Sequence, residues 1–251
     1  MTQASIVITG ASDGIGKALA WEMAQRGYSL GLTARRLNKL EEIKADILKT
    51  YPNCRIEVAA LDVSHYEDIG PCLDNLNSKL GSIDIVLANA GIAKSGKVGK
   101  TPWQQHVEVI NTNVNGAIVT LSEALRIFRA QGHGHLVGTS SVAAFRGLPN
   151  NATYSASKAA LATFMEGIRA ETINEKINEK INVTVLYPGF IDTSLNRDLK
   201  SRPFVISVEQ GAKLFADLIE AKVHSSTVPK WPWSLLGKFI KVLPTSLIAK
   251  M

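Results

Sequence analysis

The chain has 251 residues, a formal net charge of +6, and 45% hydrophobic and 20% charged residues. This composition is typical of a folded globular protein and excludes disordered, collagen-like and coiled-coil chains. The two cysteines, Cys54 and Cys72, match no metal-binding or redox spacing. The N-terminus does not resemble a signal peptide, and no apolar stretch is long enough to span a bilayer. We therefore expect a cytoplasmic protein.

Six short apolar runs rich in β-branched residues predict buried strands. Their near-continuous hydrophobicity fits strands that are covered on both faces of a parallel sheet. Segments with helical spacing lie between them, such as the one that places Ile15, Leu19 and Met23 on one face. This alternation predicts an α/β fold, a doubly wound parallel sheet of the Rossmann type with helices on both faces. The predicted strands are Ser5–Thr9, Tyr28–Thr33, Arg55–Ala60, Ile83–Ala88, His135–Thr139 and Asn182–Tyr187.

A glycine-rich turn joins the first predicted strand to the first predicted helix. Residues 9–16 read TGASDGIG, with glycines at Gly10, Gly14 and Gly16. Glycine allows a tight turn and close backbone approach, and a helix N-terminus offers N–H groups to a phosphate. The spacing differs from GxGxxG, and a tight strand–helix turn needs glycine for its geometry alone. The turn is therefore only one element of a dinucleotide site.

Two arginines, Arg35 and Arg36, follow the second predicted strand. An NAD site carries an acid at this place to bind the ribose 2′-hydroxyl. A guanidinium instead makes charge-assisted, often bidentate contacts that suit a 2′-phosphate. We therefore predict NADP(H) as the cofactor, with NAD(H) as the alternative. The other interpretation is a solvated arginine pair at a helix start, where positive charge is slightly unfavourable.

Residues 139–158, TSSVAAFRGLPNNATYSASK, contain a candidate acid–base pair. Tyr154 and Lys158 are four residues apart, so on a helix they share a face. A tyrosine hydroxyl titrates near pH 10, and a neighbouring ammonium group favours the phenolate and lowers that pKa. The pair suits proton transfer, although the same spacing elsewhere is common and usually inert.

The longest predicted helix runs from about residue 152 to residue 180. It ends in the repeat INEKINEKIN, in which Ile173, Ile177 and Ile181 would form one apolar stripe. The glutamates and lysines of the repeat would lie on the solvated side and form i,i+4 ion pairs.

We predict one domain over residues 1–228 and an amphipathic tail over residues 229–251. The tail is too short to span a bilayer. Its pattern fits packing on the domain or a partner subunit, which we favour, or contact of residues 230–248 with a membrane surface. The tail combines an apolar stripe, two preceding tryptophans and several lysines: Leu235, Leu236, Phe239, Ile240, Leu243, Trp231, Trp233, Lys230, Lys238, Lys241 and Lys250.

With these residues in place, the chain resembles the short-chain dehydrogenase/reductase family, in its compact single-domain branch. The resemblance covers residues 4–195, and its motifs occur in the family's order and spacing. They are TGASDGIG at 9–16, LDV at 61–63, ANAG at 88–91, NVNG at 113–116, Ser141, YSASK at 154–158 and YPG at 187–189.

The resemblance implies a catalytic group of four residues. Tyr154 would be the general acid that protonates a carbonyl oxygen in reduction, and the base in oxidation. Lys158 would lower the pKa of Tyr154 and bind the nicotinamide ribose. Ser141, favoured over Ser140 by its distance from Tyr154 in the sequence, would bind the substrate oxygen. Asn113 would kink its helix and hold a water molecule of the proton relay.

The resemblance also implies where the dinucleotide contacts the chain. Asp62 would contact the adenine amine, with Val63 packed nearby, and Thr193 would lie near the nicotinamide carboxamide. The predicted cofactor-binding residues are Gly10, Ser12, Asp13, Gly14, Ile15, Gly16, Arg35, Arg36, Asp62, Val63, Asn89, Ala90, Gly91, Tyr154, Lys158, Pro188, Gly189, Ile191 and Thr193.

The activity implied is hydride transfer between NADP(H) and a carbonyl or alcohol substrate, and the apolar tail favours a lipophilic one. The alternatives are a NAD-linked alcohol dehydrogenase of the same family and a non-catalytic dinucleotide-sensing regulator. Such regulators often lose the tyrosine or the lysine, which this chain keeps. We expect a homo-oligomer, either a dimer or a tetramer, without a metal site. We expect no nucleic-acid partner, because no known binding module appears.

Overall fold

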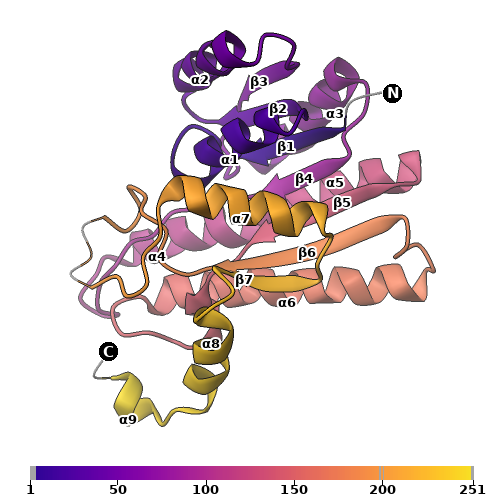
Figure 1. The fold of residues 1–251 in the computed structure, drawn as a ribbon. Coiled ribbons are helices and arrows are strands. Elements are labelled where there is room, and N and C mark those ends of the chain that lie inside the picture. The colour runs from indigo at the N-terminus through magenta and orange to yellow at the C-terminus, as the bar shows by residue number, and fades with distance from the viewer. Residues whose placement is uncertain (1–3, 198, 200, 250–251) are drawn as a thin grey trace.

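The apolar runs of the sequence form one sheet of seven parallel strands in the computed structural model, which describes residues 4–197, 199 and 201–249 (Figure 1). The strand order is β3-β2-β1-β4-β5-β6-β7. The predicted α/β doubly wound sheet is confirmed. The strands are β1 (Ser5–Thr9), β2 (Ser29–Ala34), β3 (Ile56–Ala60), β4 (Ile85–Ala88), β5 (Gly134–Thr139), β6 (Ile181–Pro188) and β7 (Ser225–Val228).

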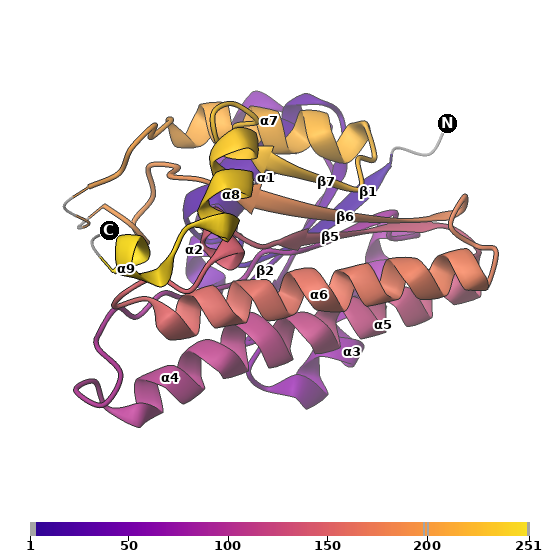
Figure 2. The same cartoon turned by 90° about the horizontal axis from the view of Figure 1, so that it is seen from below.

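Helices cover both faces of the sheet, which explains why β1 and β2 are buried at every position (Figure 2). One layer consists of α1 (Gly14–Gln25), α2 (Leu37–Thr50) and α7 (Val208–Glu220). The other consists of α3 (Ile69–Leu80), α4 (Trp103–Ile110), α5 (Ala117–Gln131) and α6 (Ala152–Asn174). A separate hydrophobic core lies between the sheet and each layer.

One arginine links the first helix to the seventh. Arg26, which follows α1, donates hydrogen bonds to Glu22 on its own helix and to Asp217 and Glu220 on α7. The N–O distances are 2.7, 2.6 and 2.6 Å. Helices α1 and α7, which are far apart in the sequence, therefore lie side by side on the same face of the sheet (Figure 1).

The helix predicted to reach residue 180 ends at Asn174, so that part of the prediction is wrong. Lys176 adopts a left-handed backbone with a φ of +58°. The Ile177 N–H then donates a 3.0 Å hydrogen bond to the Thr172 carbonyl, as in a Schellman cap. Ile177 packs against the core and Ile181 begins β6, so the predicted isoleucine stripe does not form.

The C-terminal segment adds elements that lie beyond the sheet edge formed by β7 (Figure 1). They are α8 (Trp233–Val242) and α9 (Thr245–Ile248). The apolar stripe predicted for the tail divides between two faces of α8: Leu236 and Ile240 are half-buried, whereas Leu235 and Phe239 are exposed. Within the described part of the chain, no helix is long and apolar enough to cross a membrane. Lys250 of the predicted tail lies outside the described residues.

Candidate active site

A cavity of about 390 Å³ opens at the edge of the sheet where the strands end. It lies at the switch point between β1 and β4, the place where open α/β sheets bind ligands. Two sequence-predicted residues, Gly16 and Asn113, do not line it. Those that do are Gly10, Ser12, Asp13, Gly14, Ile15, Arg35, Arg36, Asp62, Val63, Asn89, Ala90, Gly91, Ser141, Tyr154, Lys158, Pro188, Gly189, Ile191 and Thr193.

The turn from β1 into α1 forms one wall of the cavity and depends on glycine. Gly10 has a φ of +68°, and a β-carbon there would lie 2.8 Å from the Cα of Ala90. A β-carbon on Gly16 would lie 2.5 Å from the Gly10 carbonyl oxygen. Close approach therefore brings the first residues of α1, Gly14 and Ile15, to the cavity wall. A helix N-terminus at this position favours an anionic group such as a phosphate.

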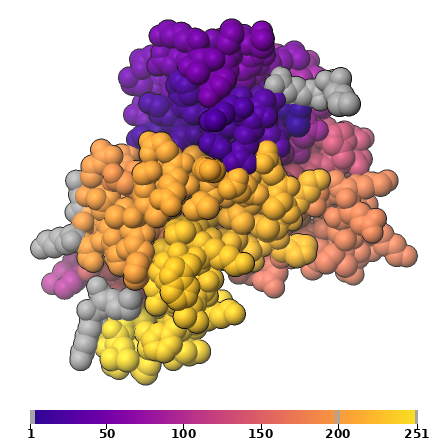
Figure 3. All heavy atoms as spheres, in the orientation of Figure 1, coloured from indigo at the N-terminus to yellow at the C-terminus, as the bar shows by residue number. Residues whose placement is uncertain are grey.

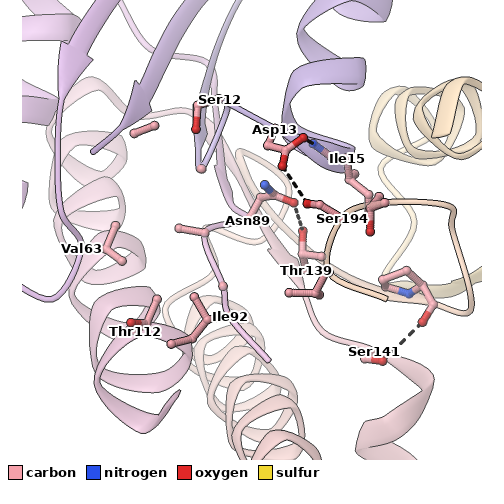
Figure 4. A pocket seen from close by; sticks show the side chains of 18 of the residues that line it. Ser12, Asp13, Ile15, Val63, Asn89, Ile92, Thr112, Thr139, Ser141 and Ser194 are labelled. Carbon is pink, nitrogen blue, oxygen red and sulfur yellow. Dashed lines mark hydrogen bonds between the residues drawn. The ribbon is translucent and has the colours of Figure 1, made fainter. Parts of the chain in front are cut away.

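Asp13 caps the N-terminus of α1. Its carboxylate accepts a hydrogen bond from the Gly14 N–H and another from the Ser194 hydroxyl, each 2.7 Å long (Figure 4). The bond from Ser194 is the main reason that the pKa of Asp13 lies below its ordinary value. Ser194 lies in the segment after β6, so the pair connects that segment to the glycine-rich turn across the cavity.

A cationic corner lies beside the glycine-rich turn. The side chains of Arg35 and Arg36 are exposed, and Arg36 donates a 3.1 Å hydrogen bond to the Ser12 hydroxyl. Burial raises the pKa of Asp62, but hydrogen bonds from Ser64 and the charge of Arg35 outweigh it, so that this pKa is lowered. The corner thus offers two guanidinium groups and one carboxylate to a ligand in the cavity.

Asn89 fastens the end of β4 to the end of β1. Its Nδ2 donates a 3.0 Å hydrogen bond to the Thr9 carbonyl. The Thr9 hydroxyl accepts hydrogen bonds from the backbone N–H groups of Asn89 and Ala90, at 3.0 and 3.1 Å. The Asn89 Oδ1 accepts a 3.5 Å bond from the Thr139 hydroxyl at the end of β5 (Figure 4). Asn89 therefore holds three strand ends together beneath the cavity.

Asn113 lies in a π-helical turn, Asn111–Gly116, which joins α4 to α5. Such turns inside helices are frequent at functional sites. The buried Asn113 amide donates to the Ile92 carbonyl at 2.9 Å and to the Ser157 hydroxyl at 3.1 Å, and accepts from the Ile92 N–H at 2.8 Å. It thus fixes the chain after β4 against α6, while Ile92 and Thr112 line the cavity (Figure 4).

The two serines that follow β5 have different contacts. The Ser140 hydroxyl is buried and donates a 2.8 Å hydrogen bond to the Lys158 carbonyl on α6. The Ser141 hydroxyl donates a long hydrogen bond, 3.4 Å, to the Pro188 carbonyl (Figure 4) and accepts one from the Ala143 N–H at 3.1 Å. The Ser140 hydroxyl therefore holds α6 in place, whereas the Ser141 hydroxyl can donate its hydrogen bond to a ligand.

Tyr154 and Lys158 lie one helical turn apart on α6 at the cavity wall. The Lys158 Nζ donates a 2.8 Å hydrogen bond to the Thr139 carbonyl and lies 5.8 Å from the centre of the Tyr154 ring. Burial lowers the pKa of Lys158 to about 8. Burial also raises the pKa of Tyr154, and the Ser141 hydroxyl offsets this only partly. That direction is opposite to the one expected from Lys158 alone, because desolvation of the phenolate is the dominant cause.

The segment after β6 forms the opposite wall. The Gly189 N–H donates a 2.9 Å hydrogen bond to the Val228 carbonyl on β7. Ile191 pairs with Ile206 in an isolated bridge, which brings these two positions side by side. Thr193 lies over the glycine-rich turn, where its methyl group is 3.4 Å from the position of a β-carbon on Gly14.

An aromatic residue from the C-terminal segment supports this wall, although its sequence pattern does not predict a role in the site. Trp233 on α8 lies against Gly189. Its ring meets Phe190 and Phe204 edge-on, with centroid distances of 5.9 and 6.0 Å. Its Nε1 is buried and has no hydrogen-bond partner among the described residues. The two tryptophans before an apolar stripe were the only signal for this contact.

Sequence reasoning also omitted several cavity-lining residues. Most of these residues are next to a predicted site residue in the sequence. They could have been predicted by extending each motif to the whole end of its strand. They are Ala34, Leu61, Ile92, Thr112, Thr139, Ser140, Ser194, Leu195 and Asn196.

The arrangement can bind an elongated anionic ligand and transfer a proton beside it. The helix N-terminus and the two arginines attract phosphate groups at one end. At the other, Tyr154 and Ser141 carry hydroxyl groups next to the buried amine of Lys158.

Comparison with known proteins agrees with this chemistry. Residues 4–203 match the sequence model of the family described as short chain dehydrogenase. An uncharacterized oxidoreductase of Mycobacterium tuberculosis is 37% identical over 248 residues, which is 98% of this chain and 96% of its own. The 11-beta-hydroxysteroid dehydrogenase 1A of Arabidopsis thaliana is 32% identical over 90% of this chain and 68% of its own. An alcohol dehydrogenase from the archaeon Thermococcus sibiricus, solved in complex with 5-hydroxy-NADP, is 26% identical, has a TM-score of 0.80, and is matched over 90% of this chain and 95% of its own.

Proposed function

The chain belongs to the short-chain dehydrogenase family of oxidoreductases, and on that basis we propose that it transfers hydride between NADP(H) and a carbonyl or alcohol substrate. One observation carries the proposal. Tyr154, Lys158 and Ser141 line the same cavity as the glycine-rich turn and the two arginines. A dinucleotide bound along this cavity would extend from a phosphate-binding end to a proton-donating end.

The residues present fit a nicotinamide dinucleotide. The glycines at 10 and 16 remove the β-carbons that would separate α1 from the strand ends. Arg35 and Arg36 supply positive charge after β2, where a 2′-phosphate is bound in this class of fold. The Thermococcus relative in complex with an NADP derivative supports the same choice. NADP(H) is therefore our proposed cofactor in preference to NAD(H).

When bound, NADP(H) supplies the hydride that reduces the substrate carbon. Tyr154 donates its hydroxyl proton to the substrate oxygen as that oxygen gains charge. The raised pKa of Tyr154 keeps the phenol protonated before the reaction, which suits an acid in the direction of reduction. The Ser141 hydroxyl donates a hydrogen bond to the same oxygen, and the Lys158 ammonium stabilises the phenolate that remains. In alcohol oxidation, each proton moves in the opposite direction.

We propose a lipophilic carbonyl or alcohol as the substrate. Aromatic rings from three segments meet beside Gly189, which lines the cavity: Phe190, Phe204 and Trp233. A relative that covers most of the chain is named as a hydroxysteroid dehydrogenase, whose substrate class is lipophilic.

The test is NADPH oxidation by the purified protein against ketones and aldehydes of graded chain length, repeated with NADH. We expect turnover that increases with chain length and a higher kcat/KM for NADPH. Tyr154→Phe should lower kcat by about 10²–10⁴-fold, the usual contribution of a general acid, while NADPH still binds. Substantial turnover by Tyr154→Phe would overturn the assigned role of Tyr154. A higher kcat/KM for NADH would overturn the cofactor assignment.

A further inference from the structure

The C-terminal helix α8 presents an apolar face that no described residue covers. We call Leu235, Phe239 and Val242 of α8, together with Trp231 just before the helix, the outer face of α8. Their exposed fractions are, in that order, 57%, 59%, 76% and 71%. The spacing of four and three residues places Leu235, Phe239 and Val242 in one stripe along the helix, and Trp231 lies two residues before its first residue. Three large apolar side chains in one exposed row, with an exposed tryptophan before it, are more than the scattered single residues that most surfaces carry.

The opposite face of α8 holds the helix on the domain. Trp233 and Gly237 are buried, and Phe145 occupies the place where a side chain on Gly237 would begin. Arg146 donates a 3.1 Å hydrogen bond to the Leu243 carbonyl just after the helix. The outer face therefore points away from the body in a fixed direction. Figures 1 and 3 show that α8 and α9 project beyond the β7 edge as a separate lobe.

The segment around the outer face is exclusively basic. No aspartate or glutamate follows Glu220 in the sequence, whereas five lysines do: Lys222, Lys230, Lys238, Lys241 and Lys250. Lys230 and Lys238 are exposed, and Lys238 borders the outer face one turn from Leu235. Lys241 lies over the Phe145 ring at 5.1 Å and so remains beside the same helix. An apolar stripe bordered by lysines is complementary to an anionic apolar surface.

We propose that the outer face of α8 docks onto an anionic lipid bilayer. The side chains of Leu235, Phe239 and Val242 enter the acyl boundary, and Trp231 lies at the headgroup level, where indole rings concentrate. Lys230 and Lys238 meet anionic headgroups. A second copy of the chain is a poorer occupant, because a twofold interface here would place lysines of one copy against lysines of the other. The proposal does not depend on the enzymatic activity.

The first test is sedimentation of the full chain with vesicles of phosphatidylcholine alone or mixed with phosphatidylglycerol. We expect the protein to pellet with the mixed vesicles and to stay in the supernatant with phosphatidylcholine alone. The double variant Leu235→Ser/Phe239→Ser should reduce the partition coefficient by at least about tenfold, since burying one such side chain contributes that much. Trp103→Ser on α4 removes an equally exposed aromatic residue and should change nothing.

A second pair of variants separates charge from apolar contact. Lys230→Glu/Lys238→Glu should weaken binding to the mixed vesicles by about fivefold or more for each lysine, and added salt should weaken wild-type binding. Lys100→Glu, an exposed lysine far along the chain from α8, is the matched control. Equal pelleting of wild type and Leu235→Ser/Phe239→Ser would overturn the proposal.

Two further outcomes are also informative. Absence of pelleting with mixed vesicles, together with a loss of dimer mass in Leu235→Ser/Phe239→Ser by analytical ultracentrifugation, would overturn the proposal and assign the face to a second copy. NADPH oxidation with a water-soluble ketone and without vesicles should be the same in wild type and in this variant. That assay therefore reports failure of the proposed function separately from failure of membrane docking.

Discussion

The indole of Trp233 occupies the place where a side chain on Gly189 would begin, so the C-terminal segment fits directly against the wall of the cavity. Gly189 in turn lies next to Pro188 and shares the cavity with Tyr154. The wall that would border the substrate therefore depends on a residue 44 positions further along the chain, through one close contact.

Gly189→Ala should force Trp233 away from the cavity wall. Overpacking of a buried site typically costs about 1–3 kcal/mol, and we expect the free energy of unfolding to fall by that amount. Gly147→Ala is the control, because no atom lies within 4 Å of its β-carbon position. Urea denaturation measures the free energy of unfolding of both variants. The variant Gly189→Ala/Trp233→Ala should be more stable than the sum of the single effects predicts, and simple additivity would contradict the contact.

The neighbouring serines should respond differently to loss of their hydroxyls. Ser141→Ala should lower kcat for carbonyl reduction by about 10²–10³-fold, as expected for a donor to a developing oxyanion. Ser140→Ala should retain most of its kcat and lose about 0.5–1.5 kcal/mol of stability, because one buried hydrogen bond to the Lys158 carbonyl is lost while that carbonyl keeps its partner within the helix. Steady-state kinetics and urea denaturation on both variants provide the check. A larger kcat loss in Ser140→Ala would reverse the assignment of the two serines.

The arginines after β2 should distinguish the two nicotinamide cofactors. Arg35→Ala and Arg36→Ala should each raise the KM for NADPH by about tenfold or more, because a charge-assisted contact to a phosphate is lost. The KM for NADH should change less than threefold. Arg36→Ala also releases Ser12, so Ser12→Ala serves as its control. Equal losses for the two cofactors would assign these arginines a structural role.

The charge of Lys158 should set the upper pH limit of carbonyl reduction. Burial lowers its pKa to about 8, so the ammonium form is present below that pH and is lost above it. We expect kcat/KM for the carbonyl substrate to fall above about pH 8, approaching tenfold per pH unit. Lys158→Arg keeps its charge over this range and should remove the fall from the profile. An unchanged profile in Lys158→Arg would contradict the assignment.

The same group should make stability depend on pH in the alkaline range. Between about pH 8 and the ordinary lysine pKa of 10.5, the unfolded chain holds a proton that the folded chain has lost. The contribution of Lys158 to stability therefore rises with pH across this window, by about 3 kcal/mol for a shift of this size. Lys158→Met should lack this rise when urea denaturation is compared at pH 7.5 and 10.5. A smaller rise in wild type than in Lys158→Met would show that the folded state favours the ammonium form of Lys158.

The motif residues could be placed from the sequence because their positions depend on interactions between residues close together in the chain. Gly10 and Gly14 are needed by one turn, and Tyr154 and Lys158 share a face through helix geometry alone. In a parallel sheet the carboxyl ends of the strands lie at the same edge, and this arrangement brings the motifs that follow the strands to one cavity.

Other features depend on contacts that the sequence pattern does not reveal. The helix over INEKINEKIN ends early because Ile177 gains more from the core than from another helical turn. The four-residue β7 is too short to give a periodic signal. The apolar stripe of the tail divided because Gly237 permits close packing of only one side of α8.

The pairing of α1 with α7 also bears on biosynthesis. The face of α1 that carries Leu19 and Met23 emerges early from the ribosome, but α7 begins only at Val208. Until then, the nascent chain lacks α7 and with it the two carboxylates that pair with Arg26. A ribosome stalled before residue 208 would therefore hold an incomplete layer that chaperones recognise, and native protection of α1 from proteases should appear only after nearly the whole chain has been made.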